Sequence, residues 1–302
     1  MSKVTYDGVV KSVAGFVEQV SELDEKTPHT LTPSVSSMTF YRGQANGEWP
    51  LSPKLYREGL FEKESVLISE FMRRAPESFT DMSRFDTLVK MQHYGLPTRM
   101  LDMTQNPLVA LFFACYGDKE VERDGALYIF PSLPVHCHES NSVSIIMKYV
   151  FEYSGMKLHI ERFAEDVRSN CNQGATHEKR YEDTSRIVSR LEVPRYAVLP
   201  SMANARIARQ HGSFLLFGMR KKDIEISDNP GTLGRKYLHF GPVQPKSAKE
   251  LWHVAQVLRV PSKAKSSILR NLALLGVTKG ILFPELDAKA EFVTRLVRRT
   301  LD

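Results

Sequence analysis

The stretch from Met91 to Cys115 constrains the fold and function of this chain more than any other segment. It reads MQHYGLPTRMLDMTQNPLVALFFAC and ends in a run that is almost entirely apolar. Gly95 and Pro97 fix a turn, so the polar groups on both sides take defined positions. A core needs few polar side chains, whereas loops on a rigid scaffold carry sites. We predict a functional loop, before an apolar helix that starts near Pro107, with the polar residues Gln92, His93, Tyr94, Thr98, Arg99, Asp102 and Thr104.

A second unusual segment, FYRGQ, begins at Phe40. Residues 38–41, with the sequence MTFY, are typical of a buried strand. Arg42 then places a permanent cation with five N–H donors at the expected strand end. Gly43 removes a side chain where something can approach the backbone closely. Two interpretations fit this segment: an anion-binding corner, or an ordinary strand exit with a surface ion pair.

Composition indicates a soluble globular protein. The chain has 302 residues, of which 42% are hydrophobic and 25% charged, enough for one large domain or two modest ones. The first residues do not resemble a signal peptide, and no apolar run is long enough to span a bilayer. Three widely spaced cysteines, Cys115, Cys137 and Cys171, favour a reducing cytoplasm without a disulfide framework.

Charge is distributed unevenly along the chain. Residues 201–302 carry 18 basic and 8 acidic side chains, a net charge of +10, whereas residues 1–200 carry 23 and 27, a net charge of −4. A basic C-terminal third suggests a polyanionic partner such as nucleic acid. A basic surface that aids solubility, or that pairs with an acidic protein, is an equal alternative. The first candidates for nucleic-acid binding are Arg206, Arg209, Arg220, Lys221 and Lys222.

Hydrophobic periodicity predicts an α+β protein, because strands alternate irregularly with helices. The predicted helices cover residues 9–23, 62–74, 85–94, 107–115, 266–277 and 292–299. The predicted strands cover residues 38–41, 125–130, 196–199, 213–219, 252–260 and 279–283. Residues 223–250 are expected to be rich in loops, and the polar stretch 169–183 to be mobile.

Other familiar chemistries find little support. HCHE at residues 136–139 invites a zinc interpretation, but adjacent side chains rarely converge on one ion and no second Cys/His pair has ligand spacing. We therefore expect no metal. Neither of the familiar glycine-rich phosphate loops occurs, and no Gly-x-Ser-x-Gly motif marks a hydrolase nucleophile.

FYRGQ and QHYGLPTRMLDMTQNPLVALFFAC together resemble the FRG domain, a family named for its Phe/Tyr-Arg-Gly motif. The later blocks NARIARQHGSF (204–214) and LFPEL (282–286) also resemble that family. The resemblance spans about residues 38–290, although residues 131–195 show little of it. It implies an N-terminal helix and linker over residues 1–35 and an FRG domain over residues 36–302. Residues 131–195 would be a helical, partly mobile insertion.

The FRG domain in turn resembles the NAD-dependent ADP-ribosyltransferases in the order of its motifs. This resemblance implies a single α+β domain, with a split, mostly antiparallel sheet and added helices. It implies catalytic roles for Arg42, Asp102, Thr104 and Gln210. NAD would be held by Arg42 at its pyrophosphate, by His93 at a ribose hydroxyl and by Tyr94 stacked on nicotinamide, with further contacts from Gly43, Gln44, Thr98 and Arg99.

Tyr94 and His93 each have a structural alternative, as a core aromatic and as a helix cap. Gln210 occupies the position, expected on a strand, where these enzymes usually carry a carboxylate. An amide can hydrogen-bond to ribose but is no general base. Glu285 comes much later and more plausibly begins the last helix.

The resemblance implies transfer of ADP-ribose from NAD to an acceptor. Together with the basic C-terminal third, it favours nucleic acid, RNA above all, as that acceptor. Bacterial FRG proteins resemble components of phage-defence and toxin–antitoxin systems, so we expect a cytoplasmic toxin, a possible antitoxin protein and no membrane partner. Two alternatives remain open: a non-catalytic FRG module that binds nucleic acid or a partner protein, and an enzyme that only hydrolyses NAD.

Overall fold

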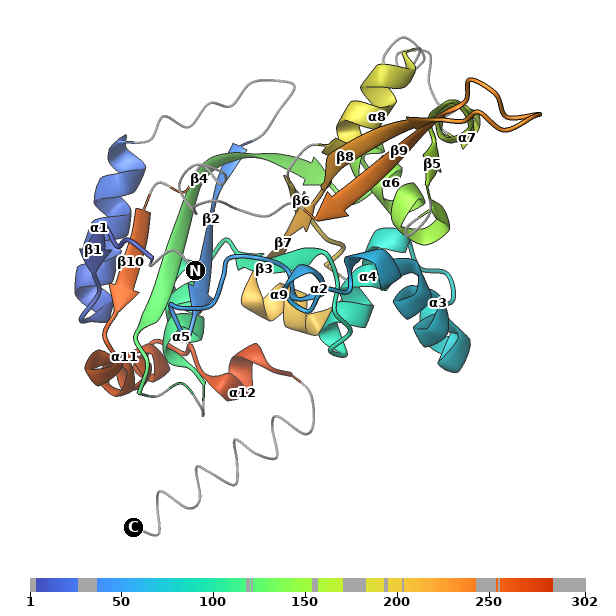
Figure 1. Ribbon diagram of the computed structural model, residues 1–302. Coiled ribbons are helices and arrows are strands. Elements are labelled where there is room, and N and C mark those ends of the chain that lie inside the picture. The colour runs from blue at the N-terminus through green and yellow to red at the C-terminus, as the bar shows by residue number, and fades with distance from the viewer. Residues whose placement is uncertain are drawn as a thin grey trace.

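The computed structural model describes residues 4–26, 37–117, 120, 122–153, 157–170, 183–192, 195–202, 204–242, 254 and 256–284. Within these ranges, no helix combines the length and the apolar composition that a membrane crossing requires. Two sheets and a set of mostly short helices make up the molecule (Figure 1).

The main sheet has seven strands in the order β1-β10-β4-β2-β3-β7-β6. Most neighbours are antiparallel, and only β1/β10 and β4/β6 are parallel. A three-stranded sheet has the order β5-β9-β8 and lies beside helices at one end (Figure 1). The strand bounds are β1 Gly8–Val9, β2 Ser37–Gln44, β3 Met100–Thr104, β4 Gly125–Cys137, β5 Leu158–His159, β6 Arg195–Leu199, β7 Gly212–Phe217, β8 Met219–Ile226, β9 Lys236–Pro242 and β10 Gln256–Val260.

Strand β4 closes the main sheet into a partial barrel. Its first residues pair with β10, its pairing with β2 extends to Pro134, and its last residues, Val135–Cys137, pair with β6. Within β4, Ser132 has a φ of +48°, and β2 shifts its register between Met38 and Phe40. These irregularities bend both strands, as bulges do in curved sheets. The protein is thus a mixed helix-and-sheet fold, as predicted, but its sheet is a partly closed barrel.

Helices cover the barrel on its outer faces. Their bounds are α1 Val13–Lys26, α2 Lys54–Arg57, α3 Glu64–Arg74, α4 Arg84–His93, α5 Pro107–Cys115, α6 Asn141–Lys148, α7 Ile160–Asn170, α8 Thr184–Glu192, α9 Ala205–Gln210, α11 Ser262–Leu274 and α12 Lys279–Leu282. Short 3₁₀ turns at Phe61–Lys63 (η1) and Pro76–Phe79 (η2) and a π-helical turn at Tyr149–Tyr153 (η3) complete the described elements.

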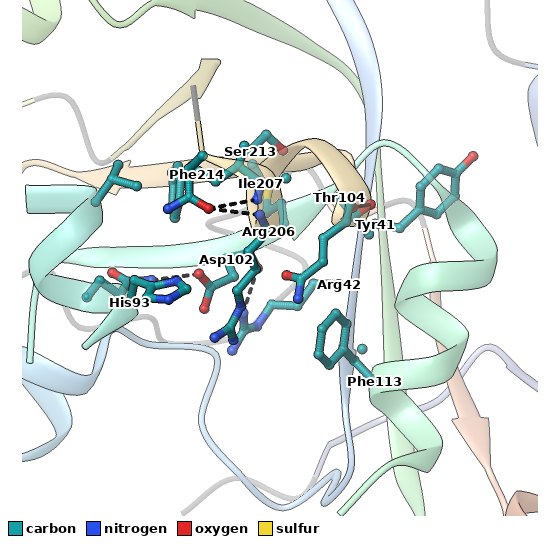
Figure 2. Close-up of a pocket in the computed structure, with 17 residues that line it drawn as sticks. Tyr41, Arg42, His93, Asp102, Thr104, Phe113, Arg206, Ile207, Ser213 and Phe214 are labelled. Carbon is teal, nitrogen blue, oxygen red and sulfur yellow. Dashed lines mark hydrogen bonds between the residues drawn. The ribbon is translucent and has the colours of Figure 1, made fainter. Parts of the chain in front are cut away.

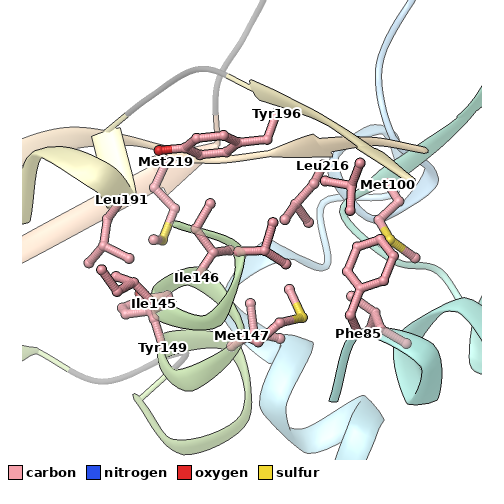
Figure 3. Packing of buried hydrophobic residues seen from close by; sticks show 14 of the residues in the cluster. Phe85, Met100, Ile145, Ile146, Met147, Tyr149, Leu191, Tyr196, Leu216 and Met219 are labelled. Carbon is pink, nitrogen blue, oxygen red and sulfur yellow. The ribbon is translucent and has the colours of Figure 1, made fainter. Parts of the chain in front are cut away.

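The apolar core has three parts. One fills the barrel and includes Phe40, Met103 and Tyr128. A second lies between the sheet and α1, α5 and α11. The third, shown in Figure 3, packs α4, α6 and η3 against β3, β6 and β7, with Phe85 and Leu216 among its residues. Because core surrounds both faces of β2 and β3, these central strands are positioned rigidly.

Helix α5 packs unusually close to the sheet, and glycine permits it. A Cβ built on Gly43 would lie 1.9 Å from the carbonyl oxygen of Ala110, and one on Gly125 would lie 2.2 Å from that of Ala114. The glycine of the FYRG segment therefore makes room for the α5 backbone.

Most predicted elements are confirmed, and three are wrong. Residues 279–282 form α12 instead of a strand, because the Thr278 side chain caps the helix by accepting from Ile281 N. The loop-rich stretch contains the hairpin β8/β9, whose first strand is exposed on both faces and so lacks an alternating pattern. Val9 belongs to strand β1, and α1 begins at Val13. The predicted helix at 292–299 lies outside the described residues, as does most of 169–183.

Candidate functional site

A cavity of about 220 Å³ opens where β2 and β3 meet α4, α5 and α9 (Figure 2). Its walls come from segments far apart in the sequence. Eight of the residues selected from the sequence line it: Arg42, Gly43, Gln92, His93, Asp102, Thr104, Arg206 and Gln210. The other lining residues are Tyr41, Val89, Met103, Phe113, Asn204, Ile207, Gly212, Ser213 and Phe214.

Strands β2 and β3 separate at this cavity. They share one residue pair, Tyr41 with Thr104, and the ladder does not continue beyond it. The Arg42 side chain bridges the gap instead, with its Nη1 donating to the carbonyl oxygen of Asp102 at 2.6 Å. Strand β2 continues to Gln44, so Arg42 lies inside the strand and not at its end. A guanidinium thus occupies the point where the sheet divides.

Arg42 keeps its charge in a partly buried position. Its Nε donates to Gln44 Oε1 at 3.3 Å. Burial lowers the pKa of Arg42, the nearby charge of Asp102 opposes that shift, and the like charge of Arg57 adds to it. An arginine starts from so high a pKa that it stays a cation at any physiological pH. The cavity therefore presents a fixed positive charge with donor capacity left for an anion.

The carboxylate of Asp102 is held by a short relay. Gln92 Nε2 donates to Asp102 Oδ1 at 2.7 Å, and the buried Thr98 hydroxyl donates to Gln92 Oε1. The Thr98 contact fixes which way the Gln92 amide faces, so its NH₂ group must point to Asp102. Asp102 is the one carboxylate among the described lining residues. In Figure 2, Asp102 and His93 face the same space as the Arg42 guanidinium.

The end of α9 and its turn into β7 form a third part of the cavity wall, after β2 and β3. Gln210 is the last residue of α9, not part of a strand as predicted. Its carbonyl accepts from the Thr104 hydroxyl at 2.6 Å, and its side-chain Nε2 donates to the carbonyl of Leu282 at 3.1 Å. His211 follows with a φ of +47°, which reverses the chain into β7. The contact between Thr104 and Gln210 thus ties the end of β3 to the end of α9.

Helix α9 also holds α12 through its basic side chains. The Arg206 guanidinium lies 4.6 Å from the ring centroid of Phe283, and Arg209 Nη1 donates to the carbonyl of Ile281 at 3.3 Å. Phe283 in turn contacts Phe113 edge to face, with centroids 6.1 Å apart. The block LFPEL thus supports the cavity wall from behind through its first residues, whereas Glu285 lies outside the described residues.

Four residues predicted to bind NAD do not line the cavity. Gln44 is buried and donates from Nε2 to the carbonyl of Trp49 at 3.0 Å. Thr98 is buried and acts only through Gln92. Arg99 is fully buried and pairs with the carboxylate of Glu64. Tyr94 points into solvent with 68% of its surface exposed.

The predicted nucleic-acid residues are dispersed. Arg220, Lys221 and Lys222 lie on the hairpin strand β8, and none of them lines the cavity. Lys222 lies 3.9 Å from a carboxylate oxygen of Glu62. Only Arg206 of the five predicted residues reaches the cavity wall.

Sequence reasoning missed several cavity residues. Phe113 looks like any other residue of an apolar helix. Asn204 could have been recognised, because its side chain accepts from the backbone N–H groups of Arg206 and Ile207 as an N-cap, which the sequence NARIARQ suggests. Ser213 is fully buried, and its hydroxyl has no hydrogen-bond partner in the part of the chain that the structure describes.

The HCHE segment does not gather around one point. Cys137 Sγ lies 3.6 Å from His138 Nδ1, whereas the His136 ring packs edge to face on Tyr196. Across the described ranges, no group of three or more His, Cys, Asp or Glu side chains is placed to hold a metal ion.

Comparison with known proteins gives one match. The FRG domain family matches residues 37–123, which run from β2 to the loop before β4. Neither the curated proteins nor the solved structures contain a significant match. The matched segment supplies Arg42, His93, Asp102 and Thr104 to the cavity. Residues 37–123 are therefore similar to the FRG domain family, and this segment supplies part of the cavity wall.

Proposed function

We propose that the cavity binds NAD and that the protein transfers ADP-ribose from NAD to an acceptor. One observation carries the proposal. Three segments chosen from sequence alone, which contain Arg42, Asp102 and Gln210, meet around one cavity where two central strands separate. A split of this kind would be the counterpart of the divided sheet that the resemblance to ADP-ribosyltransferases implies.

The side chains suit this reaction. The bond between the ribose C1′ and nicotinamide breaks, and nicotinamide leaves with the bonding electrons. C1′ then bonds to the acceptor nucleophile, which loses a proton. The transition state carries positive charge near C1′, so the protein contributes mainly positioning and electrostatic stabilisation. Arg42 would bind the pyrophosphate with charge-assisted hydrogen bonds. Asp102 would bind a ribose hydroxyl or take up the acceptor proton.

The dimensions of the cavity limit what it encloses. Ligand pockets usually measure about 300–1,000 Å³, and this cavity measures about 220 Å³. It would therefore enclose one end of NAD, and the remainder would lie outside the cavity. His93 would contact a ribose hydroxyl, and Gln210 would keep the α9 end in place through its bond to Leu282.

One observation favours a second candidate function. Asp102 is the single carboxylate lining the described part of the cavity, and Gln92 already occupies one of its oxygens. A transferase usually carries an additional carboxylate at the third motif, where this chain has Gln210. A non-catalytic FRG module that binds nucleic acid or a partner protein through the same cavity would need no such group.

A labelling experiment separates these functions. The full-length protein is incubated with NAD that carries separate labels on the adenylate phosphate and on nicotinamide, together with total RNA, DNA and protein. Transfer requires that nicotinamide is released and that the phosphate label appears on one class of macromolecule. Release of nicotinamide without such label indicates hydrolysis. Neither release nor label, with a measurable affinity for nucleic acid, indicates the binding module.

Two variants connect the outcome to the cavity. Arg42→Lys keeps the charge but loses the guanidinium fork, and we expect it to weaken NAD binding by about tenfold or more. Asp102→Asn keeps the contact with Gln92 and removes the carboxylate charge, and we expect it to abolish transfer while NAD still binds. Expression of the wild type and of Asp102→Asn in a bacterial host tests whether the activity is toxic, as expected for a defence protein with an antitoxin.

A further inference from the structure

The surface beside the cavity contains a second group of residues that the reaction itself does not use. Helix α2 and the end of α4 lie next to each other (Figure 1). Leu55 N donates to the carbonyl of Thr98 at 3.3 Å, and Lys54 Nζ donates to the carbonyl of Gly95 at 3.3 Å. We call the exposed side chains of this surface the α2–α4 rim: Lys54, Arg57 and Tyr94.

Tyr94 gives the rim an aromatic surface. It is 68% exposed, although it directly follows His93, which lines the cavity. The two rings meet edge to face with centroids 5.1 Å apart, so His93 fixes the tilt of the Tyr94 ring. An exposed ring contributes little to folding, because it buries little apolar surface. It does leave one face free for a flat group to stack on.

Arg57 and Lys54 give the rim a positive charge. Both are exposed and both interact with the same carboxylate, that of Glu58, which lies 3.8 Å from Lys54 Nζ. Two cations thus share one acid. The charge of Arg57 also reaches Arg42 inside the cavity, where it lowers the pKa of that guanidinium. A positive potential therefore extends from the cavity to the rim.

The basic residues first selected for nucleic acid are poorer candidates by comparison. Arg209 donates to the carbonyl of Ile281, and Arg206 stacks on Phe283. Arg220, Lys221 and Lys222 lie on strand β8. None of these five residues lies on α2 or at the end of α4, where the exposed aromatic ring of Tyr94 is found.

We infer that the α2–α4 rim binds a single-stranded nucleic acid, with one base stacked on Tyr94 and adjacent phosphates on Arg57 and Lys54. Stacking on an exposed aromatic beside a cationic path is how proteins hold single strands without reading a sequence. The inference rests on the proposed function, because it makes the strand the acceptor and delivers its next nucleotide to the cavity. It also moves Tyr94 from the NAD site to the acceptor site.

Anisotropy with fluorescent probes tests the inference on the full chain. One probe is a single-stranded RNA of about 12 nucleotides, and the other is an abasic ribose-phosphate strand of equal length. We expect Tyr94→Ala to weaken RNA binding about tenfold while abasic binding stays unchanged, and Tyr94→Phe to bind as the wild type does. Arg57→Ala should weaken both probes and lower the slope of log affinity against log salt by about one.

The chain offers a matched control for the aromatic. Tyr237 contacts His159 edge to face with centroids 5.2 Å apart, on the three-stranded sheet away from the cavity. Tyr237→Ala should bind RNA as the wild type does, and melting temperatures verify that every variant is folded. Unchanged RNA binding in Tyr94→Ala, equal loss for both probes, or equal loss in Tyr237→Ala would each overturn the inference. So would labelling of protein alone in the transfer assay.

Calorimetry with NAD separates this inference from the proposed function. If the wild type binds RNA through Tyr94 but does not bind NAD, the transferase proposal fails and the rim remains. If NAD binds and is consumed while Tyr94→Ala binds RNA normally, the rim proposal fails and the transferase remains.

Discussion

Replacing Arg99 tests whether this arginine is structural, as its surroundings indicate, or binds NAD, as the sequence suggested. Arg99 and Glu64 have side-chain exposures of 0% and 1%. Arg99 Nε lies 2.9 and 3.0 Å from the two carboxylate oxygens of Glu64, and Nη1 donates to the carbonyl of Phe217 at 3.2 Å. Burial is the largest single influence and acts to lower the pKa of Arg99, but the charge and hydrogen bonds of Glu64, together with Tyr56 and Tyr149, outweigh it and raise the pKa.

Arg99→Met should lower the free energy of unfolding by about 3–5 kcal/mol, because it leaves the Glu64 carboxylate buried without its cation. Glu64→Leu should cost a similar amount for the opposite reason. The double variant removes both charges and leaves mainly the Phe217 carbonyl unsatisfied, so we expect it to cost only about 1–3 kcal/mol. The coupling energy between the two sites would then be at least about 3 kcal/mol.

Urea denaturation of the wild type, the two single variants and the double variant measures these energies, and titration with NAD measures the affinity of each protein for NAD. The double variant should bind NAD within about twofold of the wild type, which is under 0.5 kcal/mol. A loss of under about 1 kcal/mol in Arg99→Met would refute the burial argument. A stable double variant that no longer binds NAD would return Arg99 to the site.

Three further predictions concern packing and pH. Gly43→Ala should destabilise the fold by about 3 kcal/mol or more in urea denaturation, because its Cβ would lie 1.9 Å from the carbonyl oxygen of Ala110. Gly15→Ala, with its nearest contact at 3.3 Å, is the control and should not destabilise the fold, because Gly15 lies in helix α1, where alanine is the better helix former. Phe283→Ala removes the ring under Arg206 and should weaken NAD binding several-fold in calorimetry with a small fall in melting temperature, whereas unchanged affinity would separate α12 from the site. Burial raises the pKa of Tyr149 to about 12, so the folded state holds this proton after the unfolded chain has lost it near pH 10. Tyr149 alone should contribute a fall in stability of roughly 2 kcal/mol as pH rises from about 10 to 12, and Tyr149→Phe should make the curve less steep there by that amount.

The amino-acid sequence could predict those helices that local residues specify. The helix from Pro107 has a proline at its first turn and an Asn106 side chain that accepts from the N–H of Leu108, and both signals are readable from the residues. It also placed Arg42 and Asp102 as candidates, and the structure brings both to one cavity. These positions are marked by polar groups in apolar surroundings, which a single sequence displays.

The parts of the fold and of the site that the sequence could not predict depend on contacts between residues far apart in the chain. Closure of the barrel requires the last residues of β4 to pair with β6, some 60 residues later along the chain, and no local pattern encodes that pairing. Thr98 and Arg99 looked like site residues because they are polar and lie between Gly95 and Asp102. Their partners are Gln92 and Glu64, and only the folded chain shows that neither Thr98 nor Arg99 lines the cavity.

The single residue pair between β2 and β3 makes this seam the weakest line of the barrel. On one side β3 is joined to β7 by five consecutive residue pairs, whereas on the other it is joined to β2 by one pair and by the hydrogen bond from Arg42. We expect a ligand that draws the guanidinium away to loosen the seam, and hydrogen exchange at the β2–β3 pair should quicken before it does along the β3–β7 ladder. Arg42, which we propose binds the anion, also joins the two strands, so we expect occupancy of the site to be coupled to the width of the gap between them.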